Sequence, residues 1–427
     1  MRYHSLSSHP IELSFSEAVI QGQATDGGLF FPQTIPKKQN WHSLAQSLLT
    51  PADIAIELLA PMLRPDVDQE TLHKICQKAF NFEIPLIQLD EQLWVLELFH
   101  GPSAAFKDIG ARFLSRLLSY ISSTKLTILV ATSGDTGGAV ASGFHQVPNI
   151  EVVILYPKGR VSPLQEKQLT CWGDNITALA VEGSFDDCQA MVKAMLSDQQ
   201  VRQKRALSSA NSINLARWLP QATYYAWASA QLQQAPYFVV PSGNLGNLAA
   251  GIFAWRRGMS TKGFIAATNR NDVFPHYLQN GQYQAKKSVH TPSNAMDVGN
   301  PSNHPRIEAL FDHDLSAMRT MVKGIAIDDE QTLASMKHAN QQYQYIFCPH
   351  GAVAFAAYQQ LSSVQRRAPH ILLATAHPAK FKEVVEPVLN QVLPLPQALA
   401  HLKDAFSLPK KSLKPTAQAL KDFLLSE

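Results

Sequence analysis

Lys107 stands in a setting that is unusual for a surface lysine. Residues 97–113 read ELFHGPSAAFKDIGARF, so Lys107 follows an apolar Ala-Ala-Phe run and directly precedes Asp108. A Gly-Pro-Ser turn comes before that run, and Gly110 follows the lysine closely. An amine pressed among apolar residues loses solvation, which disfavours its charged form and leaves a nucleophile. The alternative is an ordinary ion pair between Lys107 and Asp108, and the spacing alone leaves both open.

Two segments share a second pattern, in which a strand runs into a glycine turn and then a helix. TILVA at 127–131 is followed by TSGDTGGAVASGF, and YFVV at 237–240 is followed by PSGNLGNLAAGIF. Glycines permit a tight turn, and the N–H groups at the start of a helix attract an anion. Neither turn is a GxGxxG or Walker A sequence, so dinucleotides and nucleoside triphosphates are poorly supported. Two such turns together predict a site that holds two anionic groups.

The lysine and the turns point to one cofactor. A neutral lysine amine forms Schiff bases, and the cofactor that needs such an amine and also carries a phosphate is pyridoxal phosphate. One of the two turns would then hold the phosphate of the cofactor. We expect no metal site, because the four cysteines are scattered at 76, 171, 188 and 348 and no HExxH sequence occurs.

Composition and charge narrow the class of protein. Of the 427 residues, 45% are hydrophobic and 17% are charged, as in an ordered globular protein. The 37 Lys and Arg against 34 Asp and Glu give a net charge of +3 without a basic run, so nucleic acid and membrane are not expected partners. The N-terminal residues do not resemble a signal peptide, and no apolar run reaches membrane-spanning length. We therefore expect a cytoplasmic protein with free, reduced cysteines.

Apolar runs recur from about residue 91, and each lies near a segment of helical period. They are TILVAT (127–132), EVVILYP (151–157), YFVVPSG (237–243), FIAATN (264–269) and HILLATAHP (370–378). Strands that alternate with helices predict an α/β fold with mostly parallel sheets and helices on both faces. PADIAIELLAPML at 51–63 predicts an earlier helix, and the stretch from about 395 predicts outer helices.

The motifs together resemble one family. ELFHGPSAAFKDIGARF, ATSGDTGGAVA, VILYPKGRVSPLQEKQ, SANSIN, PSGNLGN, ATNRND, SNAMDV and TAHPAKF occur in the order, and at about the spacing, of threonine synthases of bacterial length. The resemblance covers nearly the whole chain, from DGGLFFP to the Lys-Phe pair at 380–381. It implies a fold-type II pyridoxal-phosphate enzyme, similar to the β subunit of tryptophan synthase. It further implies a lyase that converts O-phospho-L-homoserine and water into L-threonine and phosphate, the last step of threonine biosynthesis.

The resemblance also assigns the cofactor residues. Lys107 aligns with the Schiff-base lysine of the family, and Thr375 in ATAHPAKF resembles the residue that faces the pyridine nitrogen. PSGNLGN resembles the loop around the cofactor phosphate, whose residues here are Gly243, Asn244, Leu245, Gly246 and Asn247. Many relatives have Phe at position 245 and Asp at position 247, so this loop departs from them. The amide of Asn247 can donate a hydrogen bond where an aspartate could only accept one.

A second group of residues is expected to bind the substrate. The turn after the first strand is similar to the substrate-clasping turn of this fold type, and its residues are Thr132, Ser133, Gly134, Asp135 and Thr136. We assign this turn to the carboxylate or phosphate of the substrate. Asn211 and Arg217 are expected to complete the phosphate site, because the planar guanidinium of arginine donates two bonds at once. An outward-facing helix position is the alternative for Arg217. Arg112 is a further candidate, with a salt bridge to Asp108 as its alternative.

We expect three structural units and a small-molecule partner. They are an N-terminal subdomain (1–95), a smaller substrate-clasping lobe with the lysine and the TSGDTG turn (96–205), and a larger cofactor-binding lobe with C-terminal helices (206–427). The resemblance implies O-phospho-L-homoserine as the substrate, and both a monomer and a homodimer remain open. A sister pyridoxal-phosphate phospho-lyase or dehydratase, acting on a related hydroxy- or phospho-amino acid, is an alternative function. A catalytically silent cofactor-binding protein is another.

Overall fold

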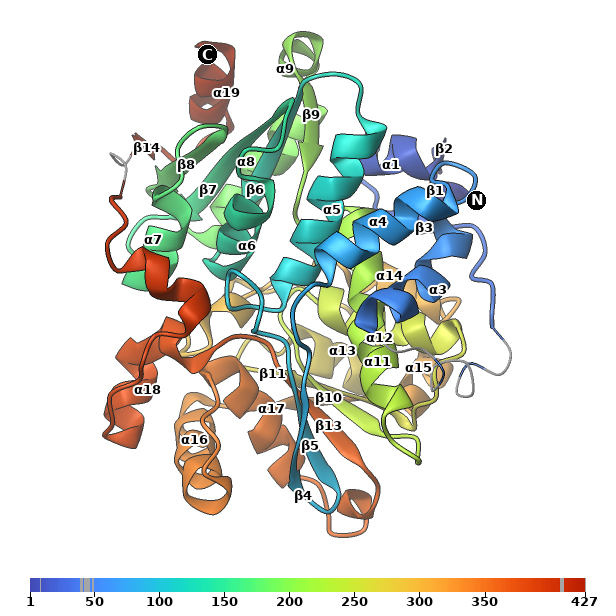
Figure 1. Cartoon of the computed structure of the whole chain (residues 1–427), viewed down its shortest axis with the longest axis vertical. Coiled ribbons are helices and arrows are strands. Elements are labelled where there is room, and N and C mark those ends of the chain that lie inside the picture. The colour runs from blue at the N-terminus through green and yellow to red at the C-terminus, as the bar shows by residue number, and fades with distance from the viewer. Residues whose placement is uncertain (8, 39–40, 42–46, 48–49, 408–410, 427) are drawn as a thin grey trace.

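Three β-sheets organise the chain. The computed structural model describes residues 1–7, 9–38, 41, 47, 50–407 and 411–426. A three-stranded sheet belongs to the N-terminal unit, a five-stranded sheet forms one lobe and a six-stranded sheet forms the other. Figure 1 shows the five-stranded sheet in the upper part of the molecule and the six-stranded sheet in the lower part.

The five-stranded sheet is parallel and has the order β14-β8-β7-β6-β9. Its strands are β6 (Leu126–Ala131), β7 (Ile150–Pro157), β8 (Ile176–Val181), β9 (Ala206–Ser209) and β14 (Lys411–Leu413). Successive side chains of a strand point to opposite faces. Ile128 packs in the same cluster as Val140 of α6 (Asp135–Phe144), whereas Leu129 packs in the cluster of Met191 of α8 (Phe185–Ser197). The continuous apolar run of β6 therefore reflects burial on both faces.

The six-stranded sheet has the order β12-β11-β10-β13-β5-β4 and is parallel except for the antiparallel pair of β4 and β5. Its strands are β4 (Leu86–Asp90), β5 (Leu93–Glu97), β10 (Tyr237–Pro241), β11 (Gly263–Thr268), β12 (Val322–Ala326) and β13 (His370–Ala374). Phe238 of β10 shares a cluster with Phe253 of α12 (Gly246–Arg256). Val239 shares one with Val353 of α17 (Pro349–Gln359). This sheet is thus also covered on both faces.

The described part of the N-terminal unit combines an antiparallel sheet with three helices. The sheet has the order β2-β1-β3, from β1 (Arg2–Ser5), β2 (Glu12–Ser14) and β3 (Phe30–Pro32). The helices are α1 (Phe15–Gln21), α3 (Pro51–Leu63) and α4 (Gln69–Ala79). Helix α4 packs on α5 (Lys107–Ile121), and α3 packs on α11 (Ala222–Ala230), so the unit lies against both lobes.

The other elements fill the layers outside the sheets. The remaining α-helices are α7 (Pro163–Thr170), α9 (Gln199–Lys204), α10 (Leu215–Trp218), α13 (Val273–Asn280), α14 (His304–Leu310), α15 (Leu315–Met321), α16 (Asp329–Tyr343), α18 (Lys382–Leu389) and α19 (Ala417–Ser426). The 3₁₀ helices are η1 (Leu219–Gln221), η2 (Asn294–Met296), η3 (Gln365–Arg367), η4 (Pro378–Phe381) and η5 (Gln397–Leu402).

The expected α/β fold is confirmed, but the expected unit boundaries need correction. All five predicted strands form, as β6, β7, β10, β11 and β13, and the predicted helix at 51–63 is α3. The boundary at 95/96 cuts β5, which belongs with β4 to the six-stranded sheet. Strands β9 and β14, expected in the larger lobe, belong to the five-stranded sheet. Parallel neighbours come from distant parts of the sequence, so local patterns do not reveal which sheet a strand joins.

Three further findings bear on the class of protein. No helix in the described part of the chain is long and apolar enough to span a membrane. The described residues contain no group of three or more His, Cys, Asp or Glu side chains suited to a metal ion. The four cysteines are free thiols.

Arg306 of α14 joins segments that are far apart in the sequence. Its side chain is fully buried, and its guanidinium donates to the carbonyl oxygens of Ser212 (2.6 Å), Ile213 (2.5 Å) and Phe30 (3.3 Å). Burial lowers the pKa of Arg306 to about 9, so the group stays charged at neutral pH. One cation thus ties the N-terminal unit to the segments around the cavity described below.

We expect Arg306→Met to lower the free energy of unfolding by about 3 kcal/mol, because it leaves buried carbonyl groups without donors. Urea unfolding measures the change. The exposed Arg367→Met serves as the control and should change stability by less than about 0.5 kcal/mol. Equal effects of the two substitutions would contradict the role given to Arg306.

Candidate active site

Lys107 is the first residue of α5, and the turn before it is bound to the end of β13. The N–H of Phe106 donates to the carbonyl of Thr375 (2.9 Å), and the N–H of His377 donates to the carbonyl of Ala104 (3.0 Å). Ala104 takes a positive φ of 53°, a conformation that costs energy for a residue with a Cβ. The position of Lys107 is therefore set by the six-stranded sheet as well as by its own helix.

The amine of Lys107 faces a cavity and is not paired with Asp108. No hydrogen bond or ion pair joins its Nζ to another described residue, and Nζ lies 4.5 Å from the centroid of the Phe106 ring. Burial lowers the pKa of Lys107 to about 8, which a nearby carboxylate opposes and neighbouring cations reinforce. Asp108 instead accepts a hydrogen bond from the N–H of Ser103 (2.9 Å), and burial raises the pKa of Asp108 to about 6. The lysine thus has the properties of a desolvated nucleophile.

One cavity collects most of the predicted site residues. Its empty space is about 860 Å³, including solvent at the mouth. The predicted residues that line it are Lys107, Ser133, Asp135, Thr136, Asn211, Arg217, Gly243, Asn244, Leu245, Gly246, Asn247 and Thr375. They come from both lobes, so the cavity exists only in the assembled tertiary structure.

The start of α12 forms one anion-binding position in this cavity. Leu245 precedes the helix in a left-handed conformation (φ 59°), and the first N–H groups of a helix have no acceptor within it. A Cβ at Gly243 would lie 2.7 Å from the Cα of Met296, so this position requires glycine. The bare backbone and the unpaired N–H groups suit a phosphate.

The loop before α12 is fixed by the segment around 302–303. Asn244 Oδ1 accepts hydrogen bonds from the N–H (2.6 Å) and the hydroxyl (2.7 Å) of Ser302. The amide of Asn303 donates to the carbonyl of Asn244 (3.0 Å) and to Ser212 Oγ (2.9 Å). The stretch NAMDVGNPSNHPR at 294–306, whose motif carried no physical role in the sequence, therefore holds the anion-binding loop in place.

Asn247, in the first turn of α12, uses the oxygen but not the nitrogen of its side-chain amide in hydrogen bonds to described residues. Its Oδ1 accepts hydrogen bonds from the hydroxyls of Tyr224 (2.6 Å) and Tyr225 (2.7 Å). Two donors on one oxygen fix the orientation of the amide. Nδ2 is buried and has no hydrogen-bond partner among the described residues. Nδ2 of Asn247 is therefore available to donate a hydrogen bond to a group bound at the start of α12.

The turn at 132–136 forms another wall of the cavity, although two of its residues do not line it. Thr132 Oγ1 accepts hydrogen bonds from the N–H groups of Gly134 (2.9 Å) and Gly137 (2.8 Å), so this hydroxyl shapes the turn. Gly134 has a φ of 128°, and a Cβ there would lie 2.5 Å from the Gln165 side chain. Ser133, Asp135 and Thr136 line the cavity. Thr132 and Gly134 are not among the residues that line the cavity, and their expected contact with the substrate stays a prediction.

Asn211 and Arg217 both line the cavity, and the outward-facing alternative for Arg217 is wrong. Asn211 pairs with the backbone of Ala131 at the end of β6, accepting at 3.0 Å and donating at 2.7 Å. Arg217 is 2% exposed and donates through Nη1 to the carbonyl of Ala210. Its Nε is buried without a partner in the described part of the chain. Burial lowers the pKa of Arg217 to about 10, so it remains a cation at neutral pH.

Arg112 lies outside the site, which corrects its predicted role. Its guanidinium donates to the carbonyls of Lys78 (2.7 Å) and Ala79 (3.2 Å) and to Asn81 Oδ1 (2.5 Å). Among the described residues it forms no salt bridge with Asp108 either. Residues 107 and 112 are not on the same face of a helix, so Arg112 points away from the cavity and fixes α5 to the end of α4.

Sequence reasoning assigned no role to two buried groups, His350 and Lys380, that act on the reactive lysine. His350, at the start of α17, lines the cavity, and its Nε2 accepts a hydrogen bond from the N–H of Ala295 (3.2 Å). Burial lowers the pKa of His350 to about 4, so the ring is neutral at pH 7. Lys380, in η4, is fully buried, and its Nζ lies 2.9 Å from Asp135 Oδ1. His350 is a single polar residue in an apolar stretch, and Lys380 lies near the end of the TAHPAKF motif. Neither belongs to a pattern of spacing from which its burial beside Lys107 could be predicted.

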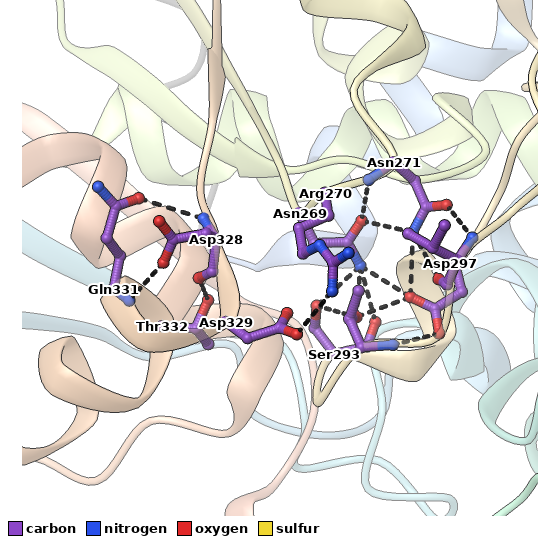
Figure 2. A network of polar contacts seen from close by, with 11 residues as sticks. Asn269, Arg270, Asn271, Ser293, Asp297, Asp328, Asp329, Gln331 and Thr332 are labelled. Atoms are coloured by element: carbon purple, nitrogen blue, oxygen red, sulfur yellow. Dashed lines mark hydrogen bonds and ion pairs between the residues drawn. The ribbon is translucent and has the colours of Figure 1, made fainter.

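A polar network fixes the loop that carries Ala295 and Met296 along the cavity. Figure 2 shows the amides of Asn269 and Asn271 converging on Asp297 Oδ1, at 2.9 and 3.2 Å. Asn269 also donates to Ser293 Oγ (2.9 Å). The two asparagines follow β11, so the network ties the 289–297 loop to the end of a central strand.

Comparisons with known proteins agree with this geometry. A family model described as pyridoxal-phosphate dependent enzyme matches residues 80–374, which places the chain in this class of fold-type II enzymes and gives its cofactor as pyridoxal phosphate. Models described as threonine synthase N terminus and threonine synthase, C-terminal, match residues 2–80 and 351–423. The chain belongs to the threonine synthase family.

Relatives of known identity cover nearly the whole chain. The threonine synthase of Haemophilus influenzae is 45% identical over 399 residues, which are 92% of each chain. The solved structure of threonine synthase from Escherichia coli has a TM-score of 0.94 and 41% identity, and the match covers 100% of both chains. A pyridoxal-phosphate-bound threonine synthase from Brucella melitensis has a TM-score of 0.90 and 33% identity, covering 99% of this chain and 98% of the other. A fungal L-serine ammonia-lyase at 14% identity and a TM-score of 0.54 shares the fold.

The residues of the cavity fit pyridoxal phosphate. The unpaired amine of Lys107 suits the aldehyde of the cofactor, and the start of α12 with the unpaired Asn247 Nδ2 suits its phosphate. Thr375 lines the same cavity and is 6% exposed. The fit rests on groups that the protein itself leaves without partners.

We expect covalent attachment of pyridoxal phosphate to Lys107 to accelerate with pH up to about 8 and to level off above it. Only the neutral amine attacks an aldehyde, so below its pKa the rate falls by about tenfold per pH unit. Stopped-flow absorbance after mixing apoprotein with the cofactor gives the profile, with Nα-acetyllysine as the reference. A midpoint at 10.5, the ordinary value of lysine, would contradict the desolvated amine.

Asn247→Asp should weaken the binding of pyridoxal phosphate by about ten- to a hundredfold. The carboxylate loses the amide donor and brings a negative charge next to the phosphate. Equilibrium titration of the apoprotein measures the dissociation constant. The exposed Asn390→Asp is the control and should leave this dissociation constant unchanged. An unchanged constant for Asn247→Asp would contradict the assignment of Asn247 to the cofactor phosphate.

Proposed function

We propose that this enzyme converts O-phospho-L-homoserine and water into L-threonine and phosphate. The observation that carries the proposal is one unpaired amine between two anion-binding positions, in a chain of the threonine synthase family. The cofactor phosphate occupies one such position. A substrate with both a carboxylate and a phosphate needs the donors on the wall that carries the turn at 132–136.

We assign the cofactor to the side of the cavity that is formed by the start of α12, Thr375 and Lys107. The start of α12 and Asn247 Nδ2 would hold its phosphate, and Thr375 would lie on the side of its ring. Lys107 Nζ would bind its aldehyde. Bound pyridoxal phosphate supplies an electron sink that acidifies the carbon–hydrogen bonds of an amino acid joined to it.

We assign the substrate to the wall that carries the turn at 132–136. The hydroxyls of Ser133 and Thr136 and the first N–H groups of α6 bind one anionic group. Arg217 binds the other, because it is a buried cation whose Nε has no partner among the described residues. Asn211 follows β9 and holds the end of the neighbouring β6 through Ala131, so it fixes the wall that carries the turn at 132–136.

Lys107 Nζ is the group that moves protons in the proposed mechanism. A pKa of about 8 makes the amine available as a base close to neutral pH, so it can take the Cα proton of the substrate. His350 is neutral, and its Nε2 already accepts a hydrogen bond, so in the proposed mechanism it positions the 294–296 segment and transfers no proton. Closure of the smaller lobe over the substrate would exclude bulk water while one molecule enters to react.

The proposed activity also bears on location and assembly. The reaction uses small metabolites, and we propose a cytoplasmic enzyme. The cavity is lined by residues of a single chain, which suits a monomer and equally a homodimer whose interface lies elsewhere.

Purified protein with pyridoxal phosphate should release one phosphate for each threonine formed from O-phospho-L-homoserine. Phosphate release and amino-acid analysis on the same sample measure the two products. Phosphate without threonine would favour the sister phospho-lyase instead. A bound cofactor with no product at all would favour a silent cofactor-binding protein.

Lys107→Ala should abolish both the absorbance of the covalently bound cofactor and the formation of threonine, by more than about 1,000-fold, because nucleophile and base are lost together. The exposed Lys382→Ala is the matched control and should retain both. Normal turnover by Lys107→Ala would contradict the proposed role of Lys107 as nucleophile and base.

A further inference from the structure

Lys380 is a fully buried lysine to which the proposed mechanism gives no role. It lies in η4, after β13, and its side chain has 0% exposure. Its Nζ lies 2.9 Å from Asp135 Oδ1 and donates to the carbonyl of Ser103 (2.8 Å). A buried ammonium is costly unless it is paired and hydrogen-bonded, so both contacts are needed to keep it there.

Both contacts of Lys380 lead to the neighbourhood of Lys107. Ser103 belongs to the turn before the reactive lysine, and its carbonyl also accepts a hydrogen bond from Gln168 (3.1 Å). Asp135 is the first residue of α6 and lines the cavity that Lys107 faces. Lys380 therefore joins the larger lobe to the two small-lobe segments that lie on either side of the amine.

Asp135 has one oxygen occupied and one available. Its Oδ1 lies 2.9 Å from Lys380 and accepts a hydrogen bond from Gln165 (3.0 Å), whereas no described residue is hydrogen-bonded to its Oδ2. Burial alone would raise the pKa of Asp135, but Lys380 and then Lys107 hold it well below its usual range. The carboxylate is thus ionised, and it lies within the electrostatic reach of the amine.

The other titratable groups that act on Lys107 do not change the balance near neutral pH. Arg217 of α10 remains a cation. Cys348, just before α17, has its pKa raised by burial to about 11, and His350 has its pKa lowered to about 4, so both are uncharged. Asp135 therefore raises the pKa of Lys107, whereas Lys380 and Arg217 lower it, and Lys380 is the cation that is ion-paired with Asp135.

We propose that Lys380 is a positioning residue that occupies Asp135 and thereby keeps this carboxylate from pairing with the amine of Lys107. After Lys380, Lys107 is the cation that acts most strongly on the buried carboxylate, so without Lys380 it is the cation left to neutralise Asp135. The resulting ion pair would stabilise the ammonium form and remove the nucleophile. The inference rests on the proposed role of Lys107 but not on the identity of the substrate.

A purely structural role for Lys380 makes a different prediction. The carbonyl of Lys380 also accepts a hydrogen bond from the hydroxyl of Ser162 (3.0 Å), so η4 is bound to the smaller lobe at several points. Loss of stability alone would follow from any disruption of these contacts. The pH dependence of the amine separates the two roles, because stability does not move the midpoint of its titration.

The test compares the pH profile of cofactor attachment in apoprotein variants. Lys380→Met should raise the midpoint by at least one pH unit relative to the unsubstituted protein, which is about a tenfold slower attachment at pH 7. The double variant Lys380→Met with Asp135→Asn should return the midpoint to the original value or below it. A midpoint that does not move in Lys380→Met, with attachment slowed equally at every pH, would overturn the proposal.

Two further variants complete the test. The exposed Lys382→Met, two residues away, is the control and should leave the midpoint unchanged. If Lys380→Met does not fold, Asp135→Asn alone decides, since it removes the carboxylate and should lower the midpoint; an unchanged or raised value contradicts the proposal. Cofactor attachment is read without substrate, so failure of threonine formation would count against the proposed function and leave this inference intact.

Discussion

Removal of the Lys107 amine from water is the constraint on which the site depends. An exposed lysine is charged at neutral pH and neither attacks an aldehyde nor accepts a proton. Burial lowers its pKa to about 8, and burial is possible because the turn before α5 is hydrogen-bonded to the end of β13. The six-stranded sheet thus controls the reactivity of a residue that belongs to a helix of the other lobe.

The same physics explains how polar groups are distributed around the cavity. Most buried polar atoms in proteins are paired, and here Asn244, Ser302 and Asn303 form a continuous hydrogen-bond network. By contrast, Arg217 Nε and Asn247 Nδ2 are buried without partners in the described part of the chain, and both residues line the cavity. Hydrogen-bonded networks therefore surround a few donors that remain without protein partners, which suits an anionic cofactor.

Local strain lies at the same site. Leu245 takes a left-handed conformation in the anion-binding loop, which costs roughly 1 kcal/mol for a residue with a Cβ. The loop around 244 is held by Ser302, and the Leu245 side chain is 2% exposed, so surrounding contacts impose the conformation. This conformation places α12 so that its first N–H groups face the cavity. The departure from Phe to Leu leaves an apolar side chain in this buried place, whereas the departure from Asp to Asn adds a donor.

The sequence by itself determined the five central strands, the two glycine turns, the lysine and the cofactor, because periodicity and turn chemistry act over a few neighbouring residues. It also brought Lys107, Asn247 and Thr375 into one site, through the family resemblance. Only the tertiary structure decided that β5 and β9 belong to different sheets than their positions in the chain imply, that Arg217 points inward and that Arg112 points away. It alone paired Lys380 with Asp135. These features depend on packing between segments that are far apart in the chain. A local sequence pattern does not show which buried charges will form an ion pair.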